Sequence, residues 1–184
     1  MQDTTNKQYD DAVANCREIF LIKSKDYGTS WRVYRMISIA DQIFIKANRI
    51  RTIQEKKEQR IKENIPDEFR GILNYAIMGL IQLDHSKENE TPDFKIDVLK
   101  TLYNDKIALA KNLMQDKNHD YGEAWRSMSQ ESFADLILAK VLRIKQIISN
   151  KGVTVRSEGI DANLFDIINY SVFALILDKY PTTT

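Results

Sequence analysis

A ten-residue pattern that combines a lysine, a carboxylate, two aromatic rings and an arginine occurs twice in this chain. It reads "KSKDYGTSWR" from Lys23 and "KNHDYGEAWR" from Lys117, 94 residues later. An aromatic ring beside a lysine can hold a nucleotide, because the ring stacks on the base and the ammonium neutralises a phosphate. The candidate substrate-binding residues of the two copies are therefore Lys23, Asp26, Tyr27, Trp31, Lys117, Asp120, Tyr121 and Trp125. For the two tryptophans, the alternative is a packing plug that caps the helices.

Three charged residues that follow the second copy recur at the same positions after the first. Asp135, Lys140 and Arg143 correspond to Asp41, Lys46 and Arg49. At 100° per residue, Lys140 and Arg143 lie within about 140° of Asp135, opposite the apolar face of a predicted helix. Such residues either form a solvated face or belong to a phosphate or ion-pair site, where a carboxylate and a guanidinium meet geometric requirements. Lys140 and Arg143 are therefore further candidates for phosphate binding.

The segment "LFDIINYSVFALIL" from Leu164 is apolar nearly all round and predicts a buried helix. Asp166, Asn169 and Tyr170 share one arc of it, and a buried carboxylate or amide needs a partner. One interpretation is a satisfied hydrogen bond in the core, and the other is a ligand site between helices. The corresponding residues of the first copy are Gly71, Asn74 and Tyr75, so Asp166 has no counterpart there.

The chain as a whole predicts an all-α fold built from two tandem repeats. Fourteen of 31 positions are identical between residues 23–53 and 117–147, where chance gives about two. Strand alternation is absent, and the few glycine and proline residues separate long helix-forming stretches. We expect one helical bundle with pseudo-twofold symmetry, in which the second and third helices of each repeat form the shared core. The expected repeats are residues 6–84 and 93–180, with helices over 6–23, 38–62, 66–84, 93–116, 132–150 and 161–178. Ser38, Ser132 and Thr91, which precedes Pro92, are candidate helix N-caps. Gly28 and Gly122 are expected to adopt a left-handed turn after the first helix of each repeat.

Composition narrows the class of protein further. The formal net charge is +1, so the whole chain carries no strong signal for nucleic acid or a membrane surface. A single cysteine, Cys16, excludes an internal disulfide, and no signal peptide or membrane-spanning run is visible. There is no P-loop, dinucleotide fingerprint or paired-cysteine metal motif. We expect a soluble cytoplasmic protein, and a homo-oligomer is compatible with this sequence.

These motifs resemble those of a bacterial and phage family, nucleotide modification-associated domain 1, which is a domain of unknown function. The resemblance rests on Lys117–Trp125, Lys140–Ile144 and Asp166–Tyr170, and the first two segments recur as Lys23–Trp31 and Lys46–Ile50. It covers nearly the whole chain as two copies. The resemblance implies a role in nucleotide or DNA-base metabolism, with a nucleotide as the bound partner.

In general shape the predicted fold is also similar to the MazG-like all-α nucleotide pyrophosphohydrolases, which hold Mg²⁺ with carboxylates on two helices. That similarity implies a metal and catalytic centre made of Glu131, Asp135 and Asp166. Ile37 and Gly71 replace the first and last of these in repeat one, so the implied centre can form only in repeat two. Mg²⁺ or Arg143 would be the partner of Asp166.

Two functions from different classes remain open at this point. One is Mg²⁺-dependent hydrolysis of a nucleoside triphosphate between its α and β phosphates. The other is a non-catalytic nucleotide-binding or scaffold module of a nucleotide or DNA modification system. The acidic residues of repeat two favour the first, and the missing carboxylate of repeat one favours the second.

Overall fold

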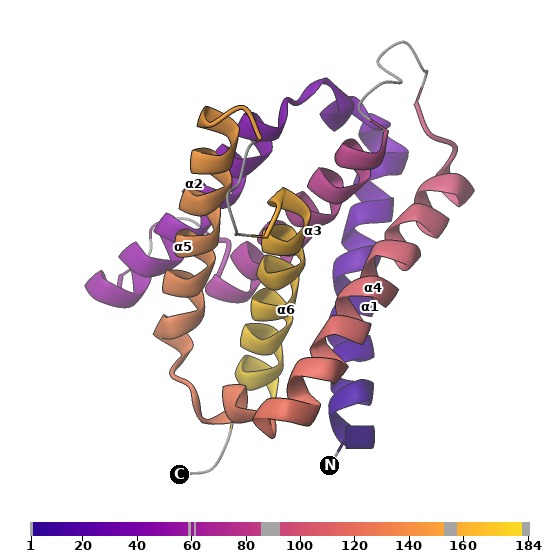
Figure 1. Ribbon diagram of the computed structural model, residues 1–184. Helices are drawn as coiled ribbons and strands as arrows, with labels where there is room; N and C mark the ends of the chain where they lie inside the picture. The colour runs from indigo at the N-terminus through magenta and orange to yellow at the C-terminus, as the bar shows by residue number, and fades with distance from the viewer. Residues whose placement is uncertain (1, 59, 61, 86–92, 153–157, 182–184) are drawn as a thin grey trace.

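A computed structural model of the chain describes residues 2–58, 60, 62–85, 93–152 and 158–181. These residues form six α-helices and two short 3₁₀-helices and contain no strand, which confirms the predicted all-α class (Figure 1). Each repeat has the same order of elements, an α-helix, a 3₁₀-helix and two further α-helices. The elements are α1 Gln2–Tyr27, η1 Ser30–Val33, α2 Met36–Lys56, α3 Ile65–Asp84, α4 Ile96–Tyr121, η2 Ala124–Ser127, α5 Gln130–Ser149 and α6 Ile160–Lys179.

Helices α3 and α6 pack against each other at the centre of the bundle. Helix α2 covers α3, α5 covers α6, and α2 and α5 also contact each other, so the predicted shared core is confirmed. Helices α1 and α4 lie side by side and run in opposite directions along the other flank (Figure 1). Helix α6 is long and apolar enough to span a membrane by length and composition, but 72% of its most apolar window is buried, as in the core helix of a globular bundle.

A reciprocal pair of hydrogen bonds joins the two repeats through the core. The Tyr9 hydroxyl donates to Asn169 Oδ1 at 2.8 Å, and the Tyr103 hydroxyl donates to Asn74 Oδ1 at 2.9 Å. Each asparagine amide also donates to a backbone carbonyl of the first helix of its own repeat. Burial raises the pKa of both tyrosines, so the hydroxyls stay protonated and can donate. The two repeats are therefore joined by a symmetric polar network in which both tyrosine hydroxyls and both asparagine amides make hydrogen bonds.

Several predicted helix ends are wrong by a few residues. Helices α2 and α5 begin before the serines that we expected as N-caps, and α2 ends at Lys56 because Lys57 adopts a left-handed conformation, with φ 55°. The first helix of each repeat continues through the D-Y pair and stops at the glycine, where φ is 63° for Gly28 and 61° for Gly122. That left-handed turn was predicted and is favoured at glycine, which has no side chain to clash. The expected cap at Thr91 and Pro92 lies outside the described residues.

Candidate functional site

A cavity of about 740 Å³ opens in repeat one between α1, η1, α2 and α3. The sequence predicted the more complete site in repeat two, yet this cavity carries the repeated motif residues of the first copy. Its volume lies within the range typical of small-molecule sites. The motif residues that line it are Lys23, Tyr27, Gly28, Trp31, Lys46, Arg49, Asn74 and Tyr75.

The basic side chains of the cavity surround one buried carboxylate, that of Glu68. Its side chain is 6% exposed, and Lys46 Nζ lies 3.0 Å from Glu68 Oε2. Arg49 contacts the other carboxylate oxygen and donates from its second terminal nitrogen to the Glu63 carbonyl at 2.8 Å. Glu68 therefore holds Lys46 and Arg49 in fixed positions beside the cavity.

Glu68 is a site residue that the sequence reasoning missed. Repeat one has Gly71 where repeat two has Asp166, and we inferred that its carboxylate was absent. Glu68 lies three residues earlier on α3, on the same face of the helix and with a longer side chain. The available signal was a pair of acidic residues, Asp67 and Glu68, in the first turn of the helix, where the helix dipole favours a negative charge.

Gly71 gives Lys46 the room to reach Glu68. A Cβ atom added at Gly71 would lie 2.8 Å from Lys46 Cε and 3.1 Å from its Nζ. The lysine side chain therefore runs directly over this glycine. A larger residue here would displace the flexible end of Lys46.

Lys23 differs from Lys46 and Arg49 because no carboxylate among the described residues pairs with it. It lies on the last turns of α1, is exposed, and lines the cavity. Within the described part of the chain it makes no hydrogen bond or ion pair. A lysine without a partner at a cavity is free to bind an anion.

In repeat two, the equivalent lysines hold the Asp166 carboxylate between them. Lys117 Nζ lies 2.6 Å from Asp166 Oδ1, and Lys140 Nζ lies 2.6 Å from Asp166 Oδ2. Burial alone would raise the pKa of Asp166, but the hydrogen bonds from Lys117 and Lys140 outweigh it and hold the pKa below its usual value. The two lysines are thus the partners of Asp166, and the expectation of Arg143 is wrong, since Arg143 is exposed on α5.

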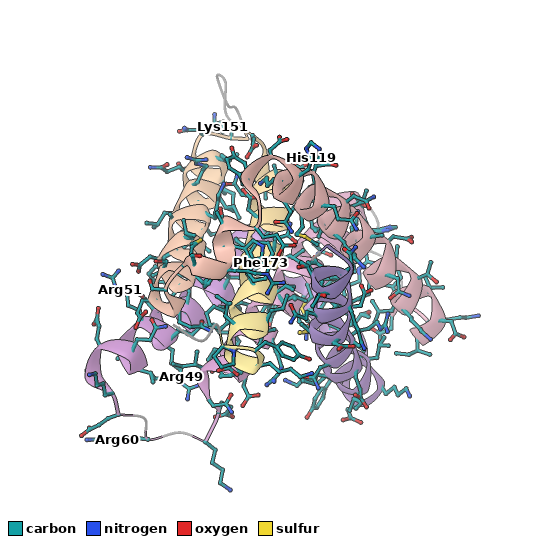
Figure 2. All side chains as sticks on the ribbon, turned by 90° about the horizontal axis from the view of Figure 1, so that it is seen from below. Arg49, Arg51, Arg60, His119, Lys151 and Phe173 are labelled. Carbon is teal, nitrogen blue, oxygen red and sulfur yellow. The ribbon has the colours of Figure 1, made fainter. Side chains whose placement is uncertain are left out.

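The two tryptophans are buried in different surroundings, although each is only 6% exposed. Trp125 stacks on Phe173, with ring centroids 4.3 Å apart, and its Nε1 donates to Asn118 Oδ1 at 3.2 Å. Phe173 lies near the middle of the bundle in Figure 2. Trp31 instead lines the cavity, and its Nε1 is buried without a hydrogen-bond partner among the described residues. Trp125 therefore packs in the core, as the alternative interpretation predicted. Trp31 packs at the wall of the cavity and keeps a buried hydrogen-bond donor that has no partner among the described residues.

The three carboxylates expected to hold Mg²⁺ do not come together. Asp166 is held by two lysines, and Glu131 is exposed in the first turn of α5. Among the described residues there is no group of three or more histidine, cysteine, aspartate or glutamate side chains that could hold a metal ion. The predicted centre of Glu131, Asp135 and Asp166 is therefore not assembled among the described residues, because Lys117 and Lys140 pair with Asp166.

Asp135 and its counterpart Asp41 instead connect the repeats across the α2–α5 contact. Asp135 Oδ1 lies 3.8 Å from Arg51, and Asp41 Oδ1 lies 2.6 Å from Lys145. Arg51 and Lys145 occupy equivalent positions of the two repeats. The repetition of the aspartates thus follows from pseudo-twofold symmetry, which makes each contact occur twice.

The remaining predicted residues of the second copy are distributed between core and surface. Asn169 belongs to the buried tyrosine–asparagine network, and half-buried Tyr170 adjoins Asp166, which together with burial raises the pKa of the Tyr170 hydroxyl. Tyr121 is 74% exposed, and exposed Asp120 contacts His119, which lies at the edge of the view in Figure 2. In the first copy Tyr27 is 72% exposed at the cavity and Asp26 is exposed.

Comparisons with known proteins identify one family. A family model described as nucleotide modification associated domain 1 matches residues 23–83 and residues 117–177, two segments that together cover most of the chain. No curated protein and no solved structure matches. The similarity to MazG-like pyrophosphohydrolases therefore stays a prediction.

Proposed function

From the premise that the chain belongs to the nucleotide modification associated domain 1 family, we propose that repeat one binds a phosphate-bearing nucleotide in its cavity. Phosphate oxygens meet Lys23 and the outer faces of Lys46 and Arg49. The base lies against Trp31 and Tyr27. Bound in this way, the protein serves as a nucleotide-binding module of a nucleotide or DNA modification system.

The observation that carries this proposal is Lys23, an unneutralised lysine at a cavity that already holds two further cations. Both Lys46 and Arg49 share a single carboxylate, so their combined charge exceeds that of Glu68. A phosphate supplies the missing negative charge and accepts several charge-assisted hydrogen bonds. The full set of charged lining residues is Lys23, Lys46, Arg49, Arg70, Glu63, Asp67 and Glu68, and within it Arg70 pairs with Asp67.

The aromatic lining supports a base rather than inorganic phosphate alone as the remainder of the ligand. Trp31, Tyr27, Tyr34 and Tyr75 line the same cavity as the cations. Stacking of a base on an aromatic side chain contributes about 1–3 kcal/mol and accepts every base.

Mg²⁺-dependent hydrolysis between the α and β phosphates remains the alternative function. Enzymes that catalyse it hold the metal with protein carboxylates. The described residues do not group three such ligands, and the cavity carboxylate Glu68 is engaged with Lys46 and Arg49. These contacts favour binding over turnover.

The test is calorimetric titration of the full chain with a panel of ribonucleoside and deoxyribonucleoside triphosphates, with and without Mg²⁺. We expect Lys23→Ala to weaken binding about tenfold, the equivalent of about 1.4 kcal/mol for a lost charge-assisted contact. Lys25→Ala is the matched control, since Lys25 is exposed two residues further along α1 and does not line the cavity. Equal affinities of the wild type and Lys23→Ala would contradict the proposal. Pyrophosphate release in the same mixtures would establish the hydrolase instead.

A further inference from the structure

The carboxylate of Asp166 is held in the way that proteins hold a bound anion. Each of its oxygens accepts from a different lysine, at 2.6 Å in both cases. Lys140 is 17% exposed and approaches from inside the bundle, whereas Lys117 is 53% exposed and approaches from the surface side. A phosphate that bridged two ammonium groups would make the same pair of charge-assisted hydrogen bonds.

Repeat one contains the same two lysines without a carboxylate between them. Lys23 and Lys46 correspond to Lys117 and Lys140, and both line the cavity. The position of Asp166 is taken by Gly71, which has no carboxylate, and the Lys46 side chain lies over this glycine. Lys46 pairs with Glu68, and Lys23 makes no ion pair with any residue in the described ranges.

We propose that repeat two contains a second, latent site for a phosphate-bearing ligand, and that the Asp166 carboxylate occupies the place of the phosphate. The inference rests on the proposed function, in which Lys23 and Lys46 bind a phosphate in repeat one. It adds that one residue, Asp166 in repeat two and Gly71 in repeat one, determines whether the lysine pair binds a ligand or the protein's own carboxylate. One chain therefore binds one ligand, and removal of Asp166 creates a second site.

The reverse substitution in repeat one should close the open site. The contact of a Cβ atom at Gly71 is with the far end of the Lys46 side chain, which can move aside. A carboxylate on that Cβ would then lie within reach of Lys46 and Lys23, as Asp166 does with their counterparts. It would compete with the ligand phosphate for both ammonium groups.

The experiment that opens repeat two uses inorganic pyrophosphate as the probe, titrated by calorimetry into the wild type and Asp166→Ala. We expect one site in the wild type and two in Asp166→Ala, with the second lost again in Asp166→Ala/Lys117→Ala. A single site in Asp166→Ala would overturn the inference. If circular dichroism shows that Asp166→Ala does not fold, Asp166→Ser takes its place, because its shorter side chain also vacates the position of the carboxylate and keeps a polar group there.

The experiment that closes repeat one compares Gly71→Asp with Gly71→Asn, which has the same size and no charge. Both variants displace Lys46, so any steric effect is common to them. We expect the dissociation constant of pyrophosphate to be at least about tenfold higher for Gly71→Asp than for Gly71→Asn. Equal constants for the two variants would also overturn the inference.

Failure of the inference and failure of the proposed function give different results. If the wild type binds pyrophosphate through Lys23 and Asp166→Ala gains no site, the function stands and the latent site does not. If the wild type does not bind but Asp166→Ala binds through Lys117, the latent site stands and the function of repeat one does not. Absence of binding in every variant overturns both.

Discussion

The two repeats carry the same pair of lysines on equivalent helices and use them in opposite ways. In repeat two, Lys117 and Lys140 both pair with Asp166 of the same repeat. In repeat one, Lys46 forms an ion pair with Glu68. Lys23 lines the cavity and has no ion-pair partner among the residues that the structure describes. The same repeated lysine pair can thus belong either to a binding site or to an internal ion pair. The residue at the position of Asp166, which is Gly71 in repeat one, determines which of the two it is.

The core between the repeats shows no such difference. Tyr9 with Asn169 and Tyr103 with Asn74 make the same hydrogen bonds across the pseudo-twofold axis, at 2.8 and 2.9 Å. These hydrogen bonds between the repeats are therefore kept, whereas the contacts of the two lysine pairs differ. The predictions below test this separation.

The largest effect is expected in the symmetric core. Asn169→Ala leaves the Tyr9 hydroxyl buried without its acceptor and removes the side-chain hydrogen bond to the Ala110 carbonyl, and we expect it to lower the free energy of unfolding by about 3 kcal/mol. Asn74→Ala removes the same contacts on the other side of the axis and should cost a similar amount. Urea unfolding followed by circular dichroism measures both. A loss below about 1 kcal/mol in either variant would show that the network is not shared symmetrically.

An intermediate effect is expected at the lysine-held carboxylate of repeat two. Asp166→Asn leaves two lysines unpaired, and because Lys117 is half exposed we expect a loss of about 2 kcal/mol at pH 7, less than for a fully buried pair. The pKa of Asp166 is below its usual value of 3.8, so its contribution to stability is present above that pH and is lost as the pH falls further.

The measurement is urea unfolding between pH 7 and pH 2. Stability of the wild type should fall below about pH 4 more steeply than that of Asp166→Asn. Asp161→Asn is the control, because Asp161 is exposed at the start of the same helix. Identical acid profiles for the wild type and Asp166→Asn would contradict the assignment of Asp166 as the ionised partner of the lysines.

The smallest effect is expected at the ion pairs that join α2 and α5. Asp135→Asn removes a contact of 3.8 Å between side chains that are both more than half exposed, so we expect a change below about 0.5 kcal/mol. Asp41→Asn should cost slightly more, because Lys145 is closer and less exposed. Thermal unfolding measures both stability changes, and a titration with Mg²⁺ and nucleotide tests whether Asp135 binds a metal. Loss of Mg²⁺-dependent nucleotide binding in Asp135→Asn would mean that Asp135 acts as a ligand.

The sequence predicted the parts of this structure that depend on local pattern. Repetition of fourteen positions predicted the two repeats, helix-forming composition predicted the class, and Gly28 and Gly122 predicted left-handed turns. Those signals work because periodicity and backbone preference are properties of neighbouring residues. They do not describe which side chains meet across the bundle.

The parts that could not be predicted all depend on partners distant in the chain. Asp135 was interpreted as a metal ligand because the sequence does not show its contact with Arg51, which lies in the other repeat. Glu68 was missed because the alignment of the repeats places Gly71, and not Glu68, at the position of Asp166. Glu68 lies three residues earlier on the same face of α3, from where its longer side chain reaches Lys46. Asn169 was left open between a core hydrogen bond and a ligand site, because its partner Tyr9 is 160 residues away in the chain.

The most direct test of the account is a side-by-side titration of Lys23→Ala and Lys117→Ala with the nucleotide that binds the wild type most tightly. The two lysines are equivalent in the repeats, and both are exposed at the end of the first helix. The account predicts about tenfold weaker binding for Lys23→Ala and unchanged binding for Lys117→Ala. Weaker binding for Lys117→Ala with unchanged binding for Lys23→Ala would place the site in repeat two and contradict the central claim.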